Sequence, residues 1–276
     1  TALDHNGKML WQSGKPDPEH AWLSYDVAVQ IHDLDGDGKT EVVMAQDNWI
    51  KVLEGNSGKE KARYPVPSSK ILPEETSWLE YKHYYRRDLL PYLNVDCISF
   101  ADLRGTGKPQ DIIIKDRHTR LWAYTNQFEL LWTASANLGH FPFFHDSNGD
   151  GKDEVYIGYS KFDPTGNLTW SLDSLLGEHA DGIYVGDLTL SGGPEQVFVG
   201  GSDDGVLMLE SNGKILKHHR VGHAQTPSIG QFRPDIPGLE FCNINFWGEP
   251  GLITLYNSSG DEIINFELFH AGSPVL

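Results

Sequence analysis

The sequence is poor in cysteine and has no long apolar run. Only Cys97 and Cys242 occur among 276 residues, each inside an apolar strand-like run, which favours two buried free thiols over a disulfide framework and leaves the redox compartment open. No apolar run reaches the roughly 18 residues that a membrane-spanning helix needs, so we expect no membrane span. The opening residues TALDHNGKMLW lack the basic and apolar regions of a signal peptide. We therefore expect a mature, trimmed or fragmentary chain.

Basic residues are the minority. The chain has 22 lysines and arginines against 39 aspartates and glutamates, for a formal net charge of -17. A surface of that sign repels a phosphate backbone, so nucleic acid is excluded as an expected partner. Many of the acidic residues cluster in loops rather than being spread evenly along the chain.

Glycine, proline and aromatic residues are plentiful, and they favour short strands joined by tight turns. The sequence contains 29 Gly, 15 Pro, 8 Trp, 11 Tyr and 12 Phe. Aromatic side chains suit the pleated surface of a sheet, whereas this much glycine and proline does not suit a helical bundle. The predicted fold class is all-β.

An acidic, glycine-containing loop recurs along the chain. Its copies begin at positions 33, 102, 146, 187 and 231, with spacings of 69, 44, 41 and 44, and read DLDGDGKTEVV, DLRGTGKPQDIII, DSNGDGKDEVYIG, DLTLSGGPEQVFVG and QFRPDIPGLEFCNI. A short apolar segment precedes each copy, and a β-branched segment follows all but the last, where EFCNI takes its place. Each loop is therefore predicted to be a turn between two strands.

A hairpin follows each loop. Two apolar runs flank a turn in every repeat, and Gly58, Gly166, Gly213 and Gly260 stand where a turn requires positive φ. Four strands in a period of about 40 to 45 residues are typical of a β-propeller blade, and the period is too long for most β-helices. We predict a β-propeller of four-stranded blades.

The organisation expected is one β-propeller domain over residues 1–276. Five full blades are visible, with a partial blade at each end, and we expect a ring of six to eight blades. Either the two partial blades pair to close a six-bladed ring, or the chain is a segment of a larger propeller. The long first spacing places an insertion at about 68–93, expected as a loop on one face.

Two of the loops carry the pattern of a calcium site. Carboxylates alternate along a tight glycine turn, and a backbone carbonyl completes an oxygen cage, as hard cations require. The expected ligands are Asp33, Asp35, Asp37, the Lys39 carbonyl and Glu41 in the first loop, and Asp146, Asn148, Asp150, the Lys152 carbonyl and Glu154 in the third. Acidic turns without an ion are the alternative, which the repulsion of clustered carboxylates disfavours. The other three loops have lost ligands, and we expect turns without metal there.

Histidines recur at corresponding places of consecutive repeats. Eight residues before each loop stands the start of an innermost strand, and these positions are Tyr25, Asn94, His179 and His223, with His140 in the equivalent place of the third repeat. Asp181 and Gln225 follow two residues after His179 and His223. In a propeller such positions face one another, so the cluster could ligate a metal, accept a proton or bind a carboxylate. Separate hydrogen-bonded structural histidines remain the alternative.

The insertion carries an aromatic and cationic segment, YKHYYRRD. Aromatic faces stack on sugar rings and arginine pairs with carboxylates, so His83, Tyr84, Arg86 and Arg87 are candidate ligands of a uronic-acid polymer. Tyr25, Asp181 and Gln225 complete the predicted substrate-binding set. A lid packed on the propeller rim is the other interpretation of the insertion.

Three segments resemble a known family. GHFPFFHDSNGDGKDEVYIGYSKFDPTGNLTWSL, EHADGIYVGDL and GHAQTPSIGQFRPDIPGLEF are similar to the propeller of rhamnogalacturonan lyases of polysaccharide lyase family 11 and of the related rhamnose-uronate and ulvan lyases. The resemblance implies a secreted or periplasmic enzyme that binds Ca²⁺ and cleaves an acidic polysaccharide by β-elimination. It also implies that His140, His179 and His223 line the catalytic cleft. The candidates for the family's arginine or lysine are Arg86, Arg87 and Arg220.

A second function fits the same acidic loops. Non-catalytic extracellular modules of the FG-GAP type, similar to integrin propellers, use calcium to stiffen blades that bind protein or glycan. The two alternatives differ at the histidines, because an adhesion module has no reason to place imidazoles at successive positions around a channel. The sequence does not predict an oligomeric state.

Overall fold

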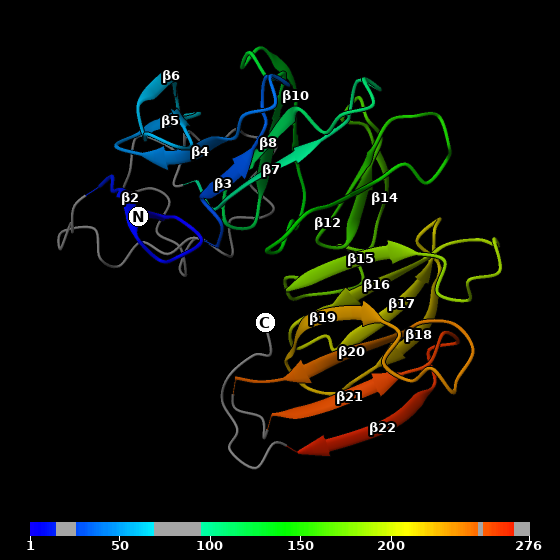
Figure 1. Ribbon diagram of the computed structural model, residues 1–276. Coiled ribbons are helices and arrows are strands. Elements are labelled where there is room, and N and C mark those ends of the chain that lie inside the picture. The colour runs from blue at the N-terminus through cyan, green and yellow to red at the C-terminus, as the bar shows by residue number, and fades with distance from the viewer. Residues whose placement is uncertain (15–25, 69–94, 248–250, 268–276) are drawn as a thin grey trace. The chain divides into compact units, whose positions relative to one another are not determined.

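Every regular element in the described part of the chain is a β-strand (Figure 1). The computed structural model describes residues 1–14, 26–68, 95–247 and 251–267. Their strands form five four-stranded antiparallel sheets and one two-stranded hairpin, and each four-stranded sheet takes its strands in chain order. Each predicted repeat is therefore one meander, which we call a blade and number 1 to 5 along the chain.

The strand bounds follow the repeats. The hairpin is β1 (Ala2–Leu3) and β2 (Met9–Trp11), and blade 1 is β3 (Val29–His32), β4 (Glu41–Gln46), β5 (Trp49–Glu54) and β6 (Glu60–Pro65). Blade 2 is β7 (Cys97–Ala101), β8 (Asp111–Lys115), β9 (Arg120–Tyr124) and β10 (Leu130–Ser135). Blade 3 is β11 (Phe143–His145), β12 (Glu154–Ile157), β13 (Ser160–Phe162) and β14 (Leu168–Ser171). Blade 4 is β15 (Gly182–Gly186), β16 (Gln196–Gly200), β17 (Val206–Glu210) and β18 (Ile215–His219), and blade 5 is β19 (Ala224–Gly230), β20 (Glu240–Asn245), β21 (Leu252–Tyr256) and β22 (Glu262–Glu267).

The chain divides into two compact units. The first, Thr1–Ser135, holds the hairpin and blades 1 and 2, and the second, Ala136–Leu276, holds blades 3 to 5. Within the first unit β3 contacts β7, and within the second β11 contacts β15 and β15 contacts β19. Within each unit the first strand of a blade thus contacts the first strand of the next blade, and in the second unit β12 and β16 also contact β15 and β19. Residues at the starts of these strands are brought together inside each unit.

Each unit has its own apolar core between neighbouring blades. Val43 of blade 1 and Ile98 and Ile112 of blade 2 belong to one buried cluster in the first unit. In the second unit Tyr156 of blade 3 and Val197 of blade 4 belong to another. The second strands supply continuous buried runs because both of their faces are covered.

A tryptophan contact repeats between successive hairpins. The Trp11 indole N–H donates to the Gly55 carbonyl at 2.9 Å, and Trp170 donates to the Ser211 carbonyl at 3.0 Å. Each ring lies so close to a turn glycine that a Cβ on Gly58 or Gly213 would come within 2.5 or 2.7 Å of it. The β1–β2 hairpin therefore packs on blade 1 as the outer half of blade 3 packs on blade 4.

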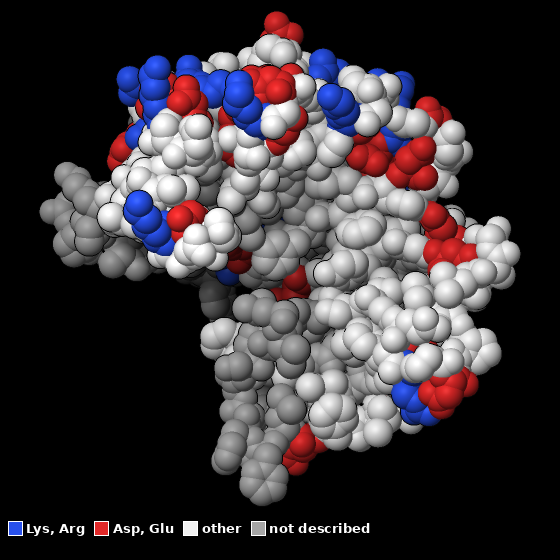
Figure 2. Space-filling model, viewed as in Figure 1, with Lys and Arg blue, Asp and Glu red and all other residues white. Residues whose placement is uncertain are grey.

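The turn glycines behave as predicted. Gly58, Gly166, Gly213 and Gly260 have φ of 69°, 86°, 87° and 76°. Both cysteines are free, but only Cys97 is buried, since Cys242 is half-buried. Except for Ser68, the predicted insertion lies outside the described residues, and no helix among the described residues is long and apolar enough to cross a membrane. On the face drawn in Figure 2, described charged side chains of both signs are interspersed rather than gathered into a basic patch.

Candidate functional site

The three predicted histidines lie together at one end of blades 3 to 5. His140 and His179 stand a few residues before β11 and β15, and His223 stands directly before β19. The ring centroids of His140 and His179 are 5.0 Å apart, and those of His179 and His223 are 6.3 Å apart. All three side chains are mostly buried, with exposed fractions between 13% and 16%. The structure therefore brings these residues into one histidine cluster, which we define as His140, His179 and His223.

Asp181 is the acidic centre of this cluster. Its Oδ1 lies 3.6 Å from His140 Nε2, and its Oδ2 lies 3.8 Å from His223 Nε2. Ser202 donates its hydroxyl hydrogen to Asp181 Oδ2, and Gln225 Nε2 donates to Oδ1 at 3.4 Å. Burial raises the pKa of Asp181, while the nearby His140 lowers it. The two substrate-binding candidates Asp181 and Gln225 are thus in mutual contact beside the imidazoles.

Gly139 permits this close packing. The His140 N–H donates to the Ala180 carbonyl at 2.9 Å, directly before Asp181. Gly139 has φ of 59°, and a Cβ there would lie 2.1 Å from the Ala180 carbonyl oxygen. Only glycine fits at that position, because any other side chain would push the backbone of His140 away from Asp181.

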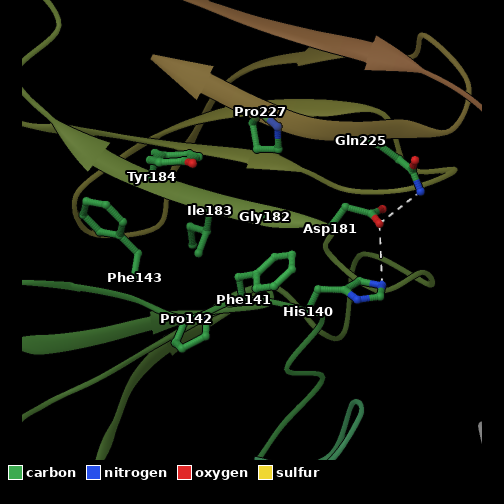
Figure 3. A pocket seen from close by; sticks show the side chains of 10 residues that line it. All are labelled: His140, Phe141, Pro142, Phe143, Asp181, Gly182, Ile183, Tyr184, Gln225 and Pro227. Carbon is green, nitrogen blue, oxygen red and sulfur yellow. Dashed lines mark hydrogen bonds and ion pairs between the residues drawn. The ribbon is translucent and has the colours of Figure 1, made fainter. Parts of the chain in front are cut away.

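A pocket of about 320 Å³ opens beside the cluster (Figure 3). His140, Asp181 and Gln225 stand at one end of it in the close-up, and aromatic rings with prolines form the remainder. The lining residues that sequence reasoning missed are Phe141, Pro142, Phe143, Gly182, Ile183, Tyr184 and Pro227. Phe143 and Tyr184 lie with ring centroids 5.5 Å apart. The motif GHFPFF signalled the first three, but nothing in the sequence indicated that Pro227 of blade 5 faces them.

The acidic loop of blade 1 gathers three carboxylates. One oxygen from each of Asp33, Asp35 and Asp37 lies within 4.8 Å of the others. Asp33 Oδ1 is buried and accepts no hydrogen bond from the described residues. Lys61 Nζ lies 2.9 Å from Asp35 and 2.7 Å from Glu41. The loop therefore fits a hard cation at its aspartates, while a lysine already neutralises part of its charge.

Glu41 and Glu154 close their loops rather than joining the aspartates. Glu41 accepts from the Leu34 N–H at 3.0 Å, and Glu154 accepts from the Ser147 N–H at 3.0 Å. The Asn148 amide nitrogen donates to Glu154 at 2.7 Å. Asp146 and Asp150 of the third loop also bind backbone: Asp146 accepts from the Gly151 N–H and Asp150 accepts from the Lys152 N–H. In the first loop the Lys39 N–H and ammonium both bind Asp37.

The loops of blades 2 and 5 contain arginine in the second ligand position. Arg104 Nε lies 2.6 Å from Asp111, and Arg233 Nη2 lies 2.6 Å from Asp235. In blade 4 Thr189 and Ser191 hydroxyls bond each other at 2.6 Å. These loops keep the turn geometry through ion pairs and hydroxyl contacts.

Blade 2 carries a buried charge network that sequence reasoning missed. Lys115 and Asp96 are fully buried and meet at 2.7 Å, and Arg117 bridges Asp96 at 3.0 Å and Asp26 at 3.1 Å. Asp96 precedes β7 as Asp181 precedes β15. A buried carboxylate thus recurs at the start of an innermost strand in both units. The other predicted binding residues, Tyr25, His83, Tyr84, Arg86 and Arg87, lie outside the described residues.

Comparison with known proteins gives the fold a name. No protein-family model and no curated protein matches the sequence. Among solved structures, rhamnogalacturonan lyase YesW is similar over 90% of this chain with 23% identity and a TM-score of 0.63. Bacillus licheniformis rhamnogalacturonan lyase PL11 is similar over 86% of this chain with 21% identity and a TM-score of 0.63, and the Dos1 propeller over 90% with 11% and 0.55. The chain has the β-propeller fold.

This chain corresponds to only part of each of these proteins. It spans 46% of the length of each of the two lyases and 63% of the Dos1 chain. At such identities the likeness establishes the propeller, as the sequence predicted, whereas the chemistry must be argued from the site itself.

Proposed function

We propose that this propeller is part of a polysaccharide lyase that cleaves an acidic polymer of rhamnose and uronate, similar to rhamnogalacturonan, by β-elimination. The observation that carries the proposal is the histidine cluster around Asp181 at the edge of an aromatic pocket. The resemblance in fold to two structures named rhamnogalacturonan lyases gives further support. An aspartate flanked by imidazoles stabilises the core little, because burying a charge costs free energy that its partners must offset. Titratable groups gathered in this way are typical of functional sites.

The chemistry needs a base, an acid and a positive charge. The base takes the proton α to the uronate carboxylate, the C–H electron pair becomes the C4=C5 double bond, and the C4 oxygen leaves with its bonding pair and receives a proton. Imidazoles can accept and donate protons near neutral pH. An imidazolium beside Asp181 also supplies positive charge toward the developing enolate. His140, His179 and His223 are thus the proposed catalytic residues.

The aromatic pocket is the proposed subsite for a neutral sugar. None of the ten residues that line it is lysine or arginine, and Asp181 stands at its end. A uronate in this pocket would face that carboxylate, whereas the apolar face of a neutral deoxysugar would contact Phe141, Phe143 and Tyr184. The uronate is then proposed to lie at the histidines, where imidazolium charge would offset the charge of Asp181.

Calcium is proposed as a structural ion of the blade 1 loop. Asp33, Asp35 and Asp37 would hold it, and the buried Asp33 Oδ1 is the oxygen that gains most from a cation. Bound there, the ion neutralises the aspartates and fixes the turn between β3 and β4. The third loop is a second proposed site, where Asp146, Asn148 and Asp150 would exchange hydrogen bonds from backbone N–H groups for bonds to the ion.

The proposed setting is outside the cytoplasm, secreted, periplasmic or at the cell surface, where an acidic polysaccharide is available. Incubating the chain with rhamnogalacturonan, ulvan and gum arabic in Ca²⁺, and following the absorbance of the new C4=C5 double bond, tests the function. A rise with one polymer supports the lyase and names its substrate. No rise with any of them, together with binding to a glycan, would favour the non-catalytic propeller module.

A further inference from the structure

A single tight turn contacts two members of the histidine cluster. It joins β16 to β17 in blade 4 and reads GSDDG, residues 201–205. Ser202 Oγ lies 3.2 Å from His179 Nε2 and donates to Asp181. Asp203 Oδ1 lies 2.6 Å from His223 Nδ1. These two neighbours in sequence therefore reach histidines of two different blades.

The third residue of the turn anchors the loop that carries His179. Asp204 Oδ2 accepts from the Gly177 and Glu178 N–H groups at 3.0 and 2.9 Å. Two consecutive N–H groups bound to one carboxylate oxygen fix the backbone directly before the imidazole. The position of His179 thus depends on the same turn.

The turn itself is held in an uncommon backbone conformation. Ser202 is buried and has φ of 48°, in the left-handed region that non-glycine residues rarely adopt. Its N–H donates to the Ala224 carbonyl at 3.2 Å, and its carbonyl accepts from the Ala224 N–H at 2.8 Å. Ala224 follows His223, so the strained serine is bonded to the strand that begins beside the second histidine. Strain of this kind persists where the surroundings fix it, and it often marks a functional site.

The hydrogen bond to Asp203 decides which nitrogen of His223 carries a hydrogen. An ionised carboxylate only accepts hydrogen bonds, so the 2.6 Å contact requires a hydrogen on Nδ1. In the neutral ring the lone pair is then on Nε2, which faces Asp181 Oδ2 at 3.8 Å. For His179 the logic is reversed, because Ser202 gives its only hydrogen to Asp181 and must accept the Nε2 hydrogen of His179.

We propose that the turn 201–205 assigns opposite tautomers to these two histidines, and that Asp203 is a positioning residue that makes His223 Nε2 the proton acceptor of the cluster. In the elimination, which rests on the proposed function, the C5–H bond breaks and its proton is transferred to His223 Nε2. Its electron pair forms the C4=C5 bond while the C4–O bond breaks, and the C4 oxygen leaves with its bonding pair and receives a proton. The tautomer assignment does not depend on any reaction. Asp203 is exposed, at 68% of its side chain, so its replacement leaves the core intact.

Long-range ¹H–¹⁵N correlation NMR on the histidine-labelled chain tests the assignment. At a pH where the imidazoles are neutral we expect the signals lost in H223Q to report hydrogen on Nδ1, and Asp203→Ala to change them to those of an Nε2–H ring. Glu195→Ala is the matched control, because Glu195 binds His145 at 2.6 Å in the same unit and its removal should leave the His223 signals unchanged. Hydrogen on Nε2 of His223 in the unmodified chain, or no response to D203A, would overturn the proposal.

A kinetic measurement separates this proposal from the proposed function. If the chain cleaves an acidic polymer, D203A should lower kcat by about 10- to 100-fold with little change in KM, because the base loses its orientation and not its contact with substrate. A change confined to KM would contradict a positioning role. If the chain has no lyase activity, the proposed function fails while the NMR result still decides the tautomer.

Discussion

Arg104 Nε and Asp111 Oδ1 meet at 2.6 Å, across the acidic loop of blade 2. In blade 1 the corresponding carboxylate, Glu41, meets Lys61 at 2.7 Å. The repeat thus retains an anion at the end of the loop and pairs it with a cation from the loop itself in blade 2 and from β6 in blade 1. The blade 1 loop differs in having three aspartates beside the ion pair, and one of their oxygens is buried without a hydrogen bond from the described residues.

Calcium should therefore stabilise the chain mainly through the blade 1 loop. At a concentration about 100 times Kd, an ion bound only to the folded state adds about 2.7 kcal/mol to the free energy of unfolding. We expect Asp33→Asn to reduce the calcium-dependent rise in Tm and D33N/D146N to abolish it, measured by thermal denaturation with Ca²⁺ and with chelator. Asp102→Asn is the control, since it should lower Tm without changing the shift. An undiminished shift in D33N would exclude this loop as a site.

The buried ion pair of blade 2 predicts a large effect of a single substitution. Lys115→Met leaves the Asp96 carboxylate buried with only Arg117 as a cation, and breaking such a pair costs about 3 kcal/mol or more. Adding Asp96→Asn should restore part of that loss, because the buried charge that has lost its lysine is then gone. Urea unfolding of the two variants and the unmodified chain measures both values. A double variant less stable than K115M would contradict this account.

Asp173 predicts a pH dependence of stability. Burial raises the pKa of its carboxyl group, whose Oδ2 accepts from the Asn137 N–H at 3.1 Å. The folded state then binds a proton more strongly than the unfolded state, so the contribution of Asp173 to stability falls as pH rises from about 3.9 through the raised pKa. Asp173→Asn removes this dependence. The free energy of unfolding of D173N, minus that of the unmodified chain, should therefore rise across that pH window and be constant above it. Urea unfolding at several pH values measures this difference. A difference that does not change with pH would contradict the prediction.

Gly139 predicts a test of how tightly His140 is held. Gly139→Ala places a Cβ 2.1 Å from the Ala180 carbonyl oxygen, whereas Gly149→Ala, also at positive φ, meets no atom within 4 Å. The control should lose about 1–2 kcal/mol from backbone strain alone. G139A should lose about 1–3 kcal/mol more, because the overlap forces a backbone shift. Chemical denaturation of the two variants gives the difference, and equal losses would show that the approach of His140 to Asp181 is not tight.

The repeat and its turns could be predicted from the sequence because they depend on local chemistry. Strands such as Asp111–Lys115 and Gly182–Gly186 are apolar runs beside glycine turns, and Gly58 or Gly213 must have positive φ whatever surrounds the turn. The histidine cluster could be predicted from the equivalent positions of its members in successive repeats. Its three members recur at one place in consecutive blades, and adjacency of the blades brings them together.

The groups that orient the histidines could not be predicted in this way. Ser202 contacts His179 and Asp181 of its own blade, whereas Asp203 contacts His223 of the next blade. The left-handed backbone of Ser202 has no sequence signature, although the DG pair at 204–205 indicated a turn. Pro227 of blade 5 reaches the pocket because Gly182 and Gly200 of blade 4 lack side chains that would block it. This contact joins residues of two blades, so no local sequence pattern predicts it. Glu41 matched a ligand pattern, but a lysine from β6 engages it in the structure.

The proposed catalytic role of the histidine cluster is tested most directly by comparing its three members with a histidine outside it. We would measure the rate of C4=C5 double-bond formation from rhamnogalacturonan by the unmodified chain and by His140→Gln, His179→Gln, His223→Gln and His145→Gln. We expect a measurable rate in the unmodified chain, which each of the three cluster substitutions lowers by about 100-fold or more, while the rate of H145Q stays within about twofold. Retained rates in the cluster variants would contradict the proposed role.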